Sequence, residues 1–217
     1  MRPIQKTISY AAADPNSAVT AETPADGVNL TLGGAFASAG VVTFPEATTV
    51  DFTSSDDISD VTFTVTGTDA SGLPISESVT GVNNNTVSTV KLFKTITIIG
   101  VATVSTYTTE TVEVGNPDTP SFGYTGWWPL DIYVPNQVTT ISCNELSGSV
   151  TYSVEYTNED PFDTTITQLA VAHPVAALTN ATADQTAFTT TLMRAVRVNC
   201  SAGYGALRVT VVQQSTQ

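Results

Sequence analysis

Two short acidic segments are the first places in this sequence where side chains could do chemistry. Ser54 to Asp60 carries three aspartates, and Glu159 to Asp163 carries three acidic residues. Closely spaced carboxylates are the hard oxygen ligands that Ca²⁺ uses. The first segment lacks the glycine and the distal glutamate of a calcium-binding loop, and acidic residues beside strands commonly only keep a loop in water. We therefore expect charged loops, and no metal site, at both segments.

His173 is the only histidine of the chain and stands directly before Pro174. One imidazole without a second histidine cannot build the usual metal sites, and a catalytic histidine needs a nucleophile or an acid beside it. The sequence contains no Gly-x-Ser-x-Gly elbow, no Walker loop, no dinucleotide fingerprint and no Cys-x-x-Cys pair. We therefore expect a protein that is not an enzyme and that uses no cofactor.

Four aromatic residues form the one group that could recognise a partner. These candidate interface residues are Phe122, Tyr124, Trp127 and Trp128. Large amphipathic rings dominate protein interfaces and also stack on sugars. The alternative is that the rings only pack one domain against another. A glycan-binding or glycan-cleaving module, using the two tryptophans with acids such as Asp131 and Glu155, is the rival from another functional class.

The composition predicts which elements position these residues. Thr, Val and Ile together make up 75 of the 217 residues, and such β-branched side chains suit the pleated surface of a sheet. Turn signals recur about every ten residues, which is typical of sandwiches and barrels and not of βαβ units. We predict an all-β chain without significant helix.

The charge and the termini limit the partners. With a net charge of −13 and few clustered Lys or Arg, the chain is not expected to bind nucleic acid or an anionic membrane. No apolar run approaches a membrane span, and the first residues do not resemble a secretory signal, so we expect a protein kept in a cytosol or exported by another route. For Cys143 and Cys200, this setting favours reduced, buried thiols over a disulfide bridge.

The clearest single element is a β-hairpin between Asp60 and Gly81. Apolar and hydroxyl residues alternate from Asp60 to Thr66, Gly72 supplies a turn, and Ile75 to Val79 alternates again. Near the C-terminus, the glycines of Gly203 to Gly205 predict the turn between the last two strands. The longest apolar segment, around Phe93 and Ile96, is expected to bulge, because these two residues cannot share a face under strict alternation.

We predict two β-sandwich domains, Ig-like or jelly-roll-like, preceded by an extended N-terminal arm. The boundary is expected where glycines and prolines gather. The predicted parts are an arm with a first strand at 1–27, a sandwich at 28–115, a linker at 116–126 and a second sandwich at 127–217.

Several strings along the chain resemble a group of structural proteins of tailed-bacteriophage virions. The resemblance is carried by Asp60 to Gly72 and Ile75 to Gly81, and then by Leu92 to Ile96. It continues in shorter strings, which are Tyr152 to Thr157, Asp160 to Asp163, His173-Pro174 and Ala195 to Val198. These are scaffold motifs, and no catalytic residue can be carried over from them.

The resemblance implies a non-enzymatic virion protein assembled in the host cytoplasm. We expect a capsid decoration or cement protein that stabilises the head shell. Its partners would be the major capsid protein or other virion proteins and copies of itself, with a trimer favoured as the homo-oligomer. A tail or neck component and a glycan-binding tail adhesin remain as alternatives.

Overall fold

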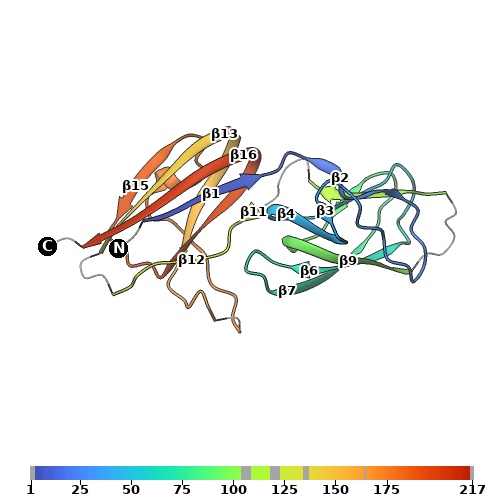
Figure 1. The fold of residues 1–217 in the computed structure, drawn as a ribbon, viewed down its shortest axis with the longest axis horizontal. Coiled ribbons are helices and arrows are strands. Elements are labelled where there is room, and N and C mark those ends of the chain that lie inside the picture. Colours follow the sequence, from blue (N-terminus) through green and yellow to red (C-terminus); the bar gives the residue numbers. More distant parts are fainter. Residues whose placement is uncertain (1–2, 104–108, 118–122, 134–136, 164, 216–217) are drawn as a thin grey trace. The chain divides into compact units, whose positions relative to one another are not determined.

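The computed structural model describes residues 3–103, 109–117, 123–133, 137–163 and 165–215. This part of the chain is all-β, as predicted: every strand pair is antiparallel, and the only helical element in it is a single 3₁₀ turn, η1 (Ala176–Leu178). None of its helical segments has the length and apolar character to cross a bilayer. The chain divides into two compact units (Figure 1), and one of them is discontinuous. Unit 1 is Met1–Tyr10 with Phe122–Gln217, and unit 2 is Ala11–Ser121.

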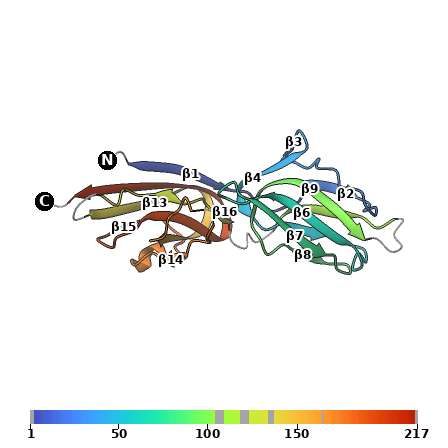
Figure 2. The same cartoon turned by 90° about the horizontal axis from the view of Figure 1, so that it is seen from below.

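Unit 2 consists of two sheets that enclose one core. The four-stranded sheet has the order β2-β10-β5-β8, and the five-stranded sheet has the order β3-β4-β9-β6-β7. Figure 2 shows β9, β6 and β7 side by side in the second sheet. The strands are β2 (Asp14–Glu22), β3 (Ala37–Ser38), β4 (Val41–Thr48), β5 (Asp51–Thr53), β6 (Thr62–Thr68), β7 (Pro74–Thr80), β8 (Thr86–Ser88), β9 (Phe93–Thr103) and β10 (Val112–Asn116).

Alternation along the strands directs apolar side chains of both sheets into this core. Phe52 of the first sheet stacks on Phe63 of the second, with ring centroids 4.7 Å apart. Both rings are fully buried, and the threonines that alternate with Phe63 in β6 lie on the other face. This is the period-two pattern that the sequence displays between Asp60 and Thr66.

The predicted hairpin and the predicted bulge are both confirmed. β6 pairs with β7 over its full length, and Gly72 in the turn has a φ of +81°. Phe93 and Ile96 are both fully buried, and the pairing of β9 with β4 shifts register between them. An irregular register is the way in which two residues three apart reach the same face of a strand.

Unit 1 is built on two strands of 21 residues each, β13 (Gln137–Thr157) and β16 (Ala195–Ser215), which pair along their whole length. One half of this ribbon is flanked by β1 (Ile4–Tyr10) and β15 (Gln185–Thr189), as Figure 1 shows. The other half is flanked by three short strands, which are β11 (Gly123–Tyr124), β12 (Trp128–Pro129) and β14 (Val171–Ala172).

Three glycines let the long ribbon bend between its halves. Gly148, Gly203 and Gly205 all have positive φ, and a Cβ on any of them would lie 2.0 to 2.2 Å from a backbone oxygen of the facing strand. Cys143 and Tyr152 stand on either side of the bend in the same strand, yet both are fully buried in the same hydrophobic core. The two halves therefore face each other across one core. The prediction of a hairpin turn at Gly203 to Gly205 is wrong, because these residues form a bend inside β16.

Both cysteines lie in this core as free thiols. Burial raises the pKa of Cys143 to about 12 and that of Cys200 to about 11. A thiol with so high a pKa carries almost no thiolate near neutral pH and is a poor nucleophile.

The structure confirms the predicted first strand and corrects the predicted arm that follows it. Residues 4–10 form β1, which pairs with β16 in unit 1, and residues 14–22 form β2, which pairs with β10 in unit 2. Apart from the buried Ser17, the polar side chains that favoured an arm are at least partly exposed, while Ile8, Tyr10, Ala18 and Val19 are buried. Unit 1 is therefore not the contiguous range 127–217, because it takes its β1 from the start of the chain. Residues 118–122 of the predicted linker lie outside the described residues.

Candidate interface

The predicted aromatic group is positioned by a segment that runs antiparallel to β16. β11 pairs with Asn199 and Cys200, and β12 pairs with Ala195 and Val196. Between them, Thr125 donates its amide to the carbonyl of Val198 (2.9 Å) and accepts the amide of Val198 at its hydroxyl (3.1 Å). The segment advances three residues from Thr125 to Trp128, whereas β16 changes by only two residues, from Val198 to Val196. The segment therefore bulges between Thr125 and Trp128.

The bulge places two of the predicted rings around one guanidinium. The Cζ atom of Arg197 lies 4.3 Å from the ring centroid of Tyr124 and 4.6 Å from that of Trp127. Glu155 accepts a hydrogen bond from Arg197 Nε at 2.7 Å and another from Asn199 Nδ2 at 3.1 Å. We call these five residues the Arg197 cluster. The side chains of Arg197 and Glu155 are only 16% and 18% exposed, so the ion pair is largely shielded from water.

The predicted interface residues therefore separate into three cases. Tyr124 and Trp127 are half-buried, and each has a ring face in contact with Arg197. Trp128 packs against the core of unit 1. Phe122 lies outside the described residues. Alternation along β16 and β13 puts Arg197 and Glu155 on the outer face, but the sequence contains no signal for the register that makes them neighbours.

The acids of the glycan-cleaving alternative are both engaged by neighbours. Both carboxylate oxygens of Glu155 accept hydrogen bonds within the Arg197 cluster. Asp131 accepts the backbone amide of Tyr133 at 3.0 Å, and its own backbone is bound to the side-chain amide of Gln213.

The carboxylates of the first predicted acidic loop accept hydrogen bonds from neighbouring backbone amides and from one side chain. Asp57 accepts from the amide of Ser59 and from the side chain of Asn83, and Asp56 accepts from the amide of Thr111. Among the described residues, no three His, Cys, Asp or Glu side chains gather in a way that could hold a metal ion.

The imidazole of His173 is buried and forms one hydrogen bond. Its Nδ1 accepts from the amide of Val175 at 3.2 Å, and its buried Nε2 has no hydrogen-bond partner in the part of the chain that the structure describes. Burial lowers the pKa of His173, which favours the neutral ring.

The sequence analysis did not identify the segment between β13 and β14 as a candidate interface. This segment is a loop, which we call the 158–170 loop; Thr164 in it is outside the described residues. Its large apolar side chains face solvent: Phe162 is 74% exposed, Leu169 66% and Ile166 45%.

Polar side chains hold the backbone of this loop in place. Gln168 donates to the carbonyls of Asp160 (3.1 Å) and Asp163 (2.6 Å), and Glu159 accepts the amide of Leu169. Arg194 ties the loop to β16 through an ion pair with Asp160 at 2.7 Å. The loop is therefore organised by its polar groups while its apolar groups stay available. In the sequence, single apolar residues stand here between acidic residues, threonines and a proline, and this pattern is the signal that could have identified the loop.

Comparison of the chain with protein-family models and with curated proteins finds no match.

Proposed function

We propose that this chain is a non-enzymatic structural protein of a tailed-bacteriophage virion and that it acts as a cement protein on the head shell. The observation that carries the proposal is the 158–170 loop, in which three large apolar side chains are exposed on a fixed backbone. A contiguous exposed apolar patch marks a site of protein–protein contact, and the three side chains of this short loop are the proposed patch. A preorganised loop also loses little conformational entropy when it binds.

Two further observations support an assembly protein. Both units enclose a core between layers of sheet, which suits two rigid β-sandwich bodies, and the chain resembles virion proteins in its scaffold strings. The shell partner of the loop is the major capsid protein. Copies of the chain are expected to associate as a homo-oligomer, with a trimer favoured, because edge strands such as β7 carry few charged residues to prevent pairing.

The structure offers less support for a glycan-binding adhesin. Tyr124 and Trp127 would have to stack on a sugar with the ring faces that Arg197 does not already contact. A tail or neck component needs the same rigid body as a cement protein, so it remains the alternative within the virion.

Copy number separates the two virion positions. Quantitative gel densitometry of purified particles is expected to give hundreds of copies for a shell cement, whereas a ring in the tail or neck would give about a dozen. A count near the lower value would contradict the cement assignment.

The loop itself is tested by Phe162→Ser. Because Phe162 is 74% exposed, this change is expected to leave the unfolding free energy within about 0.5 kcal/mol of the wild type. Rebinding of the variant to particles stripped of the protein is expected to weaken at least tenfold, which equals about 1.4 kcal/mol. Phe188→Ser, at a position 71% exposed on β15, is the matched control. Equal rebinding by the wild type and both variants would remove the loop from the proposal.

A further inference from the structure

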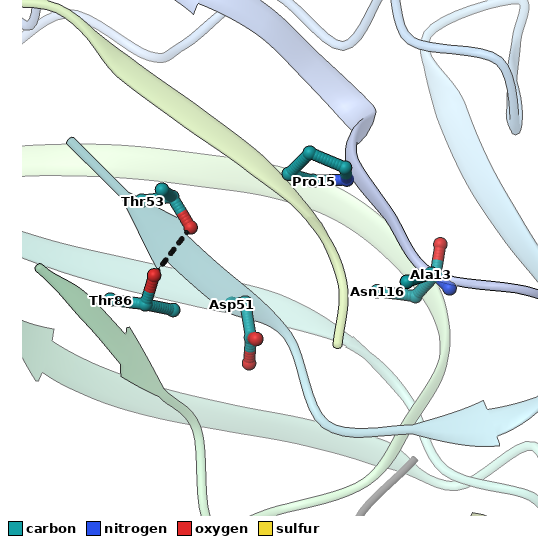
Figure 3. A pocket seen from close by; sticks show the side chains of 6 residues that line it. All are labelled: Ala13, Pro15, Asp51, Thr53, Thr86 and Asn116. Carbon is teal, nitrogen blue, oxygen red and sulfur yellow. Dashed lines mark hydrogen bonds between the residues drawn. The ribbon is translucent and has the colours of Figure 1, made fainter. Parts of the chain in front are cut away.

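Unit 2 has a pocket of about 310 Å³ on one face of its four-stranded sheet (Figure 3). Phe52 points into the core, so Asp51 and Thr53 on either side of it in β5 point to the opposite face. The pocket is lined by Ala13, Pro15, Asp51, Thr53, Thr86 and Asn116. All six residues belong to unit 2.

The wall opposite β5 is fixed by buried hydrogen bonds. Asn116 donates from Nδ2 to the carbonyl of Ala12 (2.7 Å) and accepts at Oδ1 from the hydroxyl of Ser17 (2.9 Å). A Cβ on Gly115 would lie 2.0 Å from the carbonyl oxygen of Asp14, so only glycine lets the chain before Pro15 lie this close to β10. The apolar side chains of Ala13 and Pro15 are thereby held at the pocket.

The other wall is polar and carries one charge. Asp51 accepts a hydrogen bond at Oδ1 from the hydroxyl of Ser88 at 2.6 Å, and the hydroxyls of Thr53 and Thr86 hydrogen-bond to each other at 2.9 Å. Burial raises the pKa of Asp51, whereas the hydrogen bond from Ser88 acts in the other direction. No described residue donates a hydrogen bond to Oδ2 of Asp51.

No cation of unit 2 neutralises this carboxylate. Lys91 and Lys94 are the only basic residues in the sequence of the unit, which has 13 acidic ones. The ammonium of Lys91 donates to the carbonyl of Ser76, and that of Lys94 donates to the carbonyl of Pro45. Asp51 is thus a half-buried acid in a unit whose overall field attracts cations.

We propose that this pocket binds a primary alkylammonium group, as carried by a lysine side chain of a partner protein. The ammonium has three N–H donors, which match Oδ2 of Asp51 and the free lone pairs of the two threonine hydroxyls. The methylene stem packs on Ala13 and Pro15, as lysine stems do on apolar surfaces. A hard divalent cation fits less well, because it requires several carboxylates and Asp51 is the only one that lines the pocket. The proposal goes beyond the virion function and does not depend on it.

The direct test is an NMR titration of the full-length, ¹⁵N-labelled chain with n-butylammonium. Amide shifts at Asp51, Thr53 and Thr86 are expected to saturate with a Kd of about 10 mM, a reasonable value for one small group. Added salt is expected to weaken the binding, since it screens the charge pair. The neutral analogue n-butanol is expected to give no such shifts. Equal shifts with n-butanol, or none with n-butylammonium, would overturn the proposal.

Two variants assign the effect to the pocket. Asp51→Asn keeps the acceptor for Ser88 but removes the charge, and it is expected to weaken n-butylammonium binding at least tenfold. Glu113→Gln is the matched control, because Glu113 faces Thr53 in the neighbouring strand but does not line the pocket. An equal loss in both variants would show a general effect of negative charge and would overturn the assignment. Full retention of binding by Asp51→Asn would do the same.

A second ligand shows whether the natural occupant of the pocket is a lysine side chain or a small free amine. Tighter binding of Nα-acetyl-lysinamide than of n-butylammonium identifies a lysine of a polypeptide as the natural occupant. Equal or weaker binding of the lysine derivative supports the ammonium site but assigns it to a small free amine.

Discussion

Arg197 is at the centre of the Arg197 cluster and contacts three of its other four members. Its guanidinium lies against two rings and pairs with a carboxylate that is itself held by Asn199. A cation–π contact contributes about 0.5 kcal/mol when exposed and about 2 kcal/mol when shielded from water. Loss of one partner from a shielded ion pair is costly, because the other charge stays in a site with little water.

We predict that Arg197→Ala lowers the free energy of unfolding by about 3 kcal/mol, since it removes both ring contacts and leaves Glu155 unpaired. Arg194→Ala is the matched control. The Arg194–Asp160 pair has the same 2.7 Å separation, but its side chains are 39% and 42% exposed. Its loss is expected to cost less than about 1 kcal/mol. Urea unfolding of both variants checks the difference, and equal losses would contradict it.

Glu46 makes stability depend on pH in mildly acidic solution. Burial raises the pKa of Glu46 from 4.5 to about 7, an effect that outweighs the opposing charge of Lys94 at 4.0 Å. Between these two values the folded chain keeps a proton that the unfolded chain has released. The contribution of Glu46 to stability is therefore complete below pH 4.5 and is lost as the pH rises towards 7.

We predict that Glu46→Gln removes this loss, which amounts to about 3 kcal/mol at most. The measurement is the unfolding free energy of wild type and variant at several pH values from 4.5 to 7. The difference between the two proteins should change steadily across this window, in favour of the variant at higher pH. A difference that does not vary with pH would contradict the prediction.

At the scale of elements, the bend in the β13–β16 ribbon decides the architecture of unit 1. The sequence shows the glycines of Gly203 to Gly205, but the choice between a turn and a bend depends on the strand that lies opposite. Gly148 pairs with Gly205, and Ser149 with Tyr204, so the pairing continues through the glycines. That partner is far away in the sequence, and local patterns cannot identify it. The hairpin at Gly72 could be predicted because both of its strands are local.

We predict that Gly203→Ala is much more destabilising than Gly72→Ala. The two glycines have φ of +83° and +81°, so the backbone penalty for alanine is the same, about 1 kcal/mol. A Cβ at 203 also lies 2.0 Å from the carbonyl oxygen of Ser149, whereas nothing lies within 4 Å of one at 72. The crowding is expected to add about 2 kcal/mol. Thermal unfolding checks this order, and equal effects would show that the ribbon can open at the bend.

For the whole molecule, the important feature is that unit 1 is assembled from both ends of the chain. All-β character and two bodies could be predicted from composition and turn spacing. The first strand could also be predicted, because polar and apolar residues alternate from Lys6 to Tyr10. The unit to which this strand belongs could not be predicted, because local patterns do not show its partner. The partners of Lys6 and Ser9 are Val209 and Ala206 near the other end of the sequence. Tyr124 and Trp127 could be identified from the sequence as members of one aromatic group, but their contact with Arg197 and the exposed side chains of the 158–170 loop could not.

We predict that deleting residues 1–10 disrupts unit 1 and leaves unit 2 folded. The deletion exposes the edge of β16 and removes Ile8 and Tyr10 from the core of unit 1, whereas the core of unit 2 contains no residue of this segment. Amide hydrogen exchange resolved by residue is the measurement. Protection is expected to fall by at least tenfold in β13 and β16 and to stay unchanged in β6 and β9. Loss of protection in both units would contradict the division into two bodies.

The pairing of β1 with β16 also determines the order in which the two units can fold during synthesis on the ribosome. β1 is made before all of unit 2, and its partner strand β16 is made after all of unit 2. Unit 2 can fold as soon as its own residues have left the ribosome, while β1 waits with Ile8 and Tyr10 uncovered. Closing so long a loop is slow in comparison with local pairing. The nascent chain is thus open to wrong strand pairing until β16 has been made.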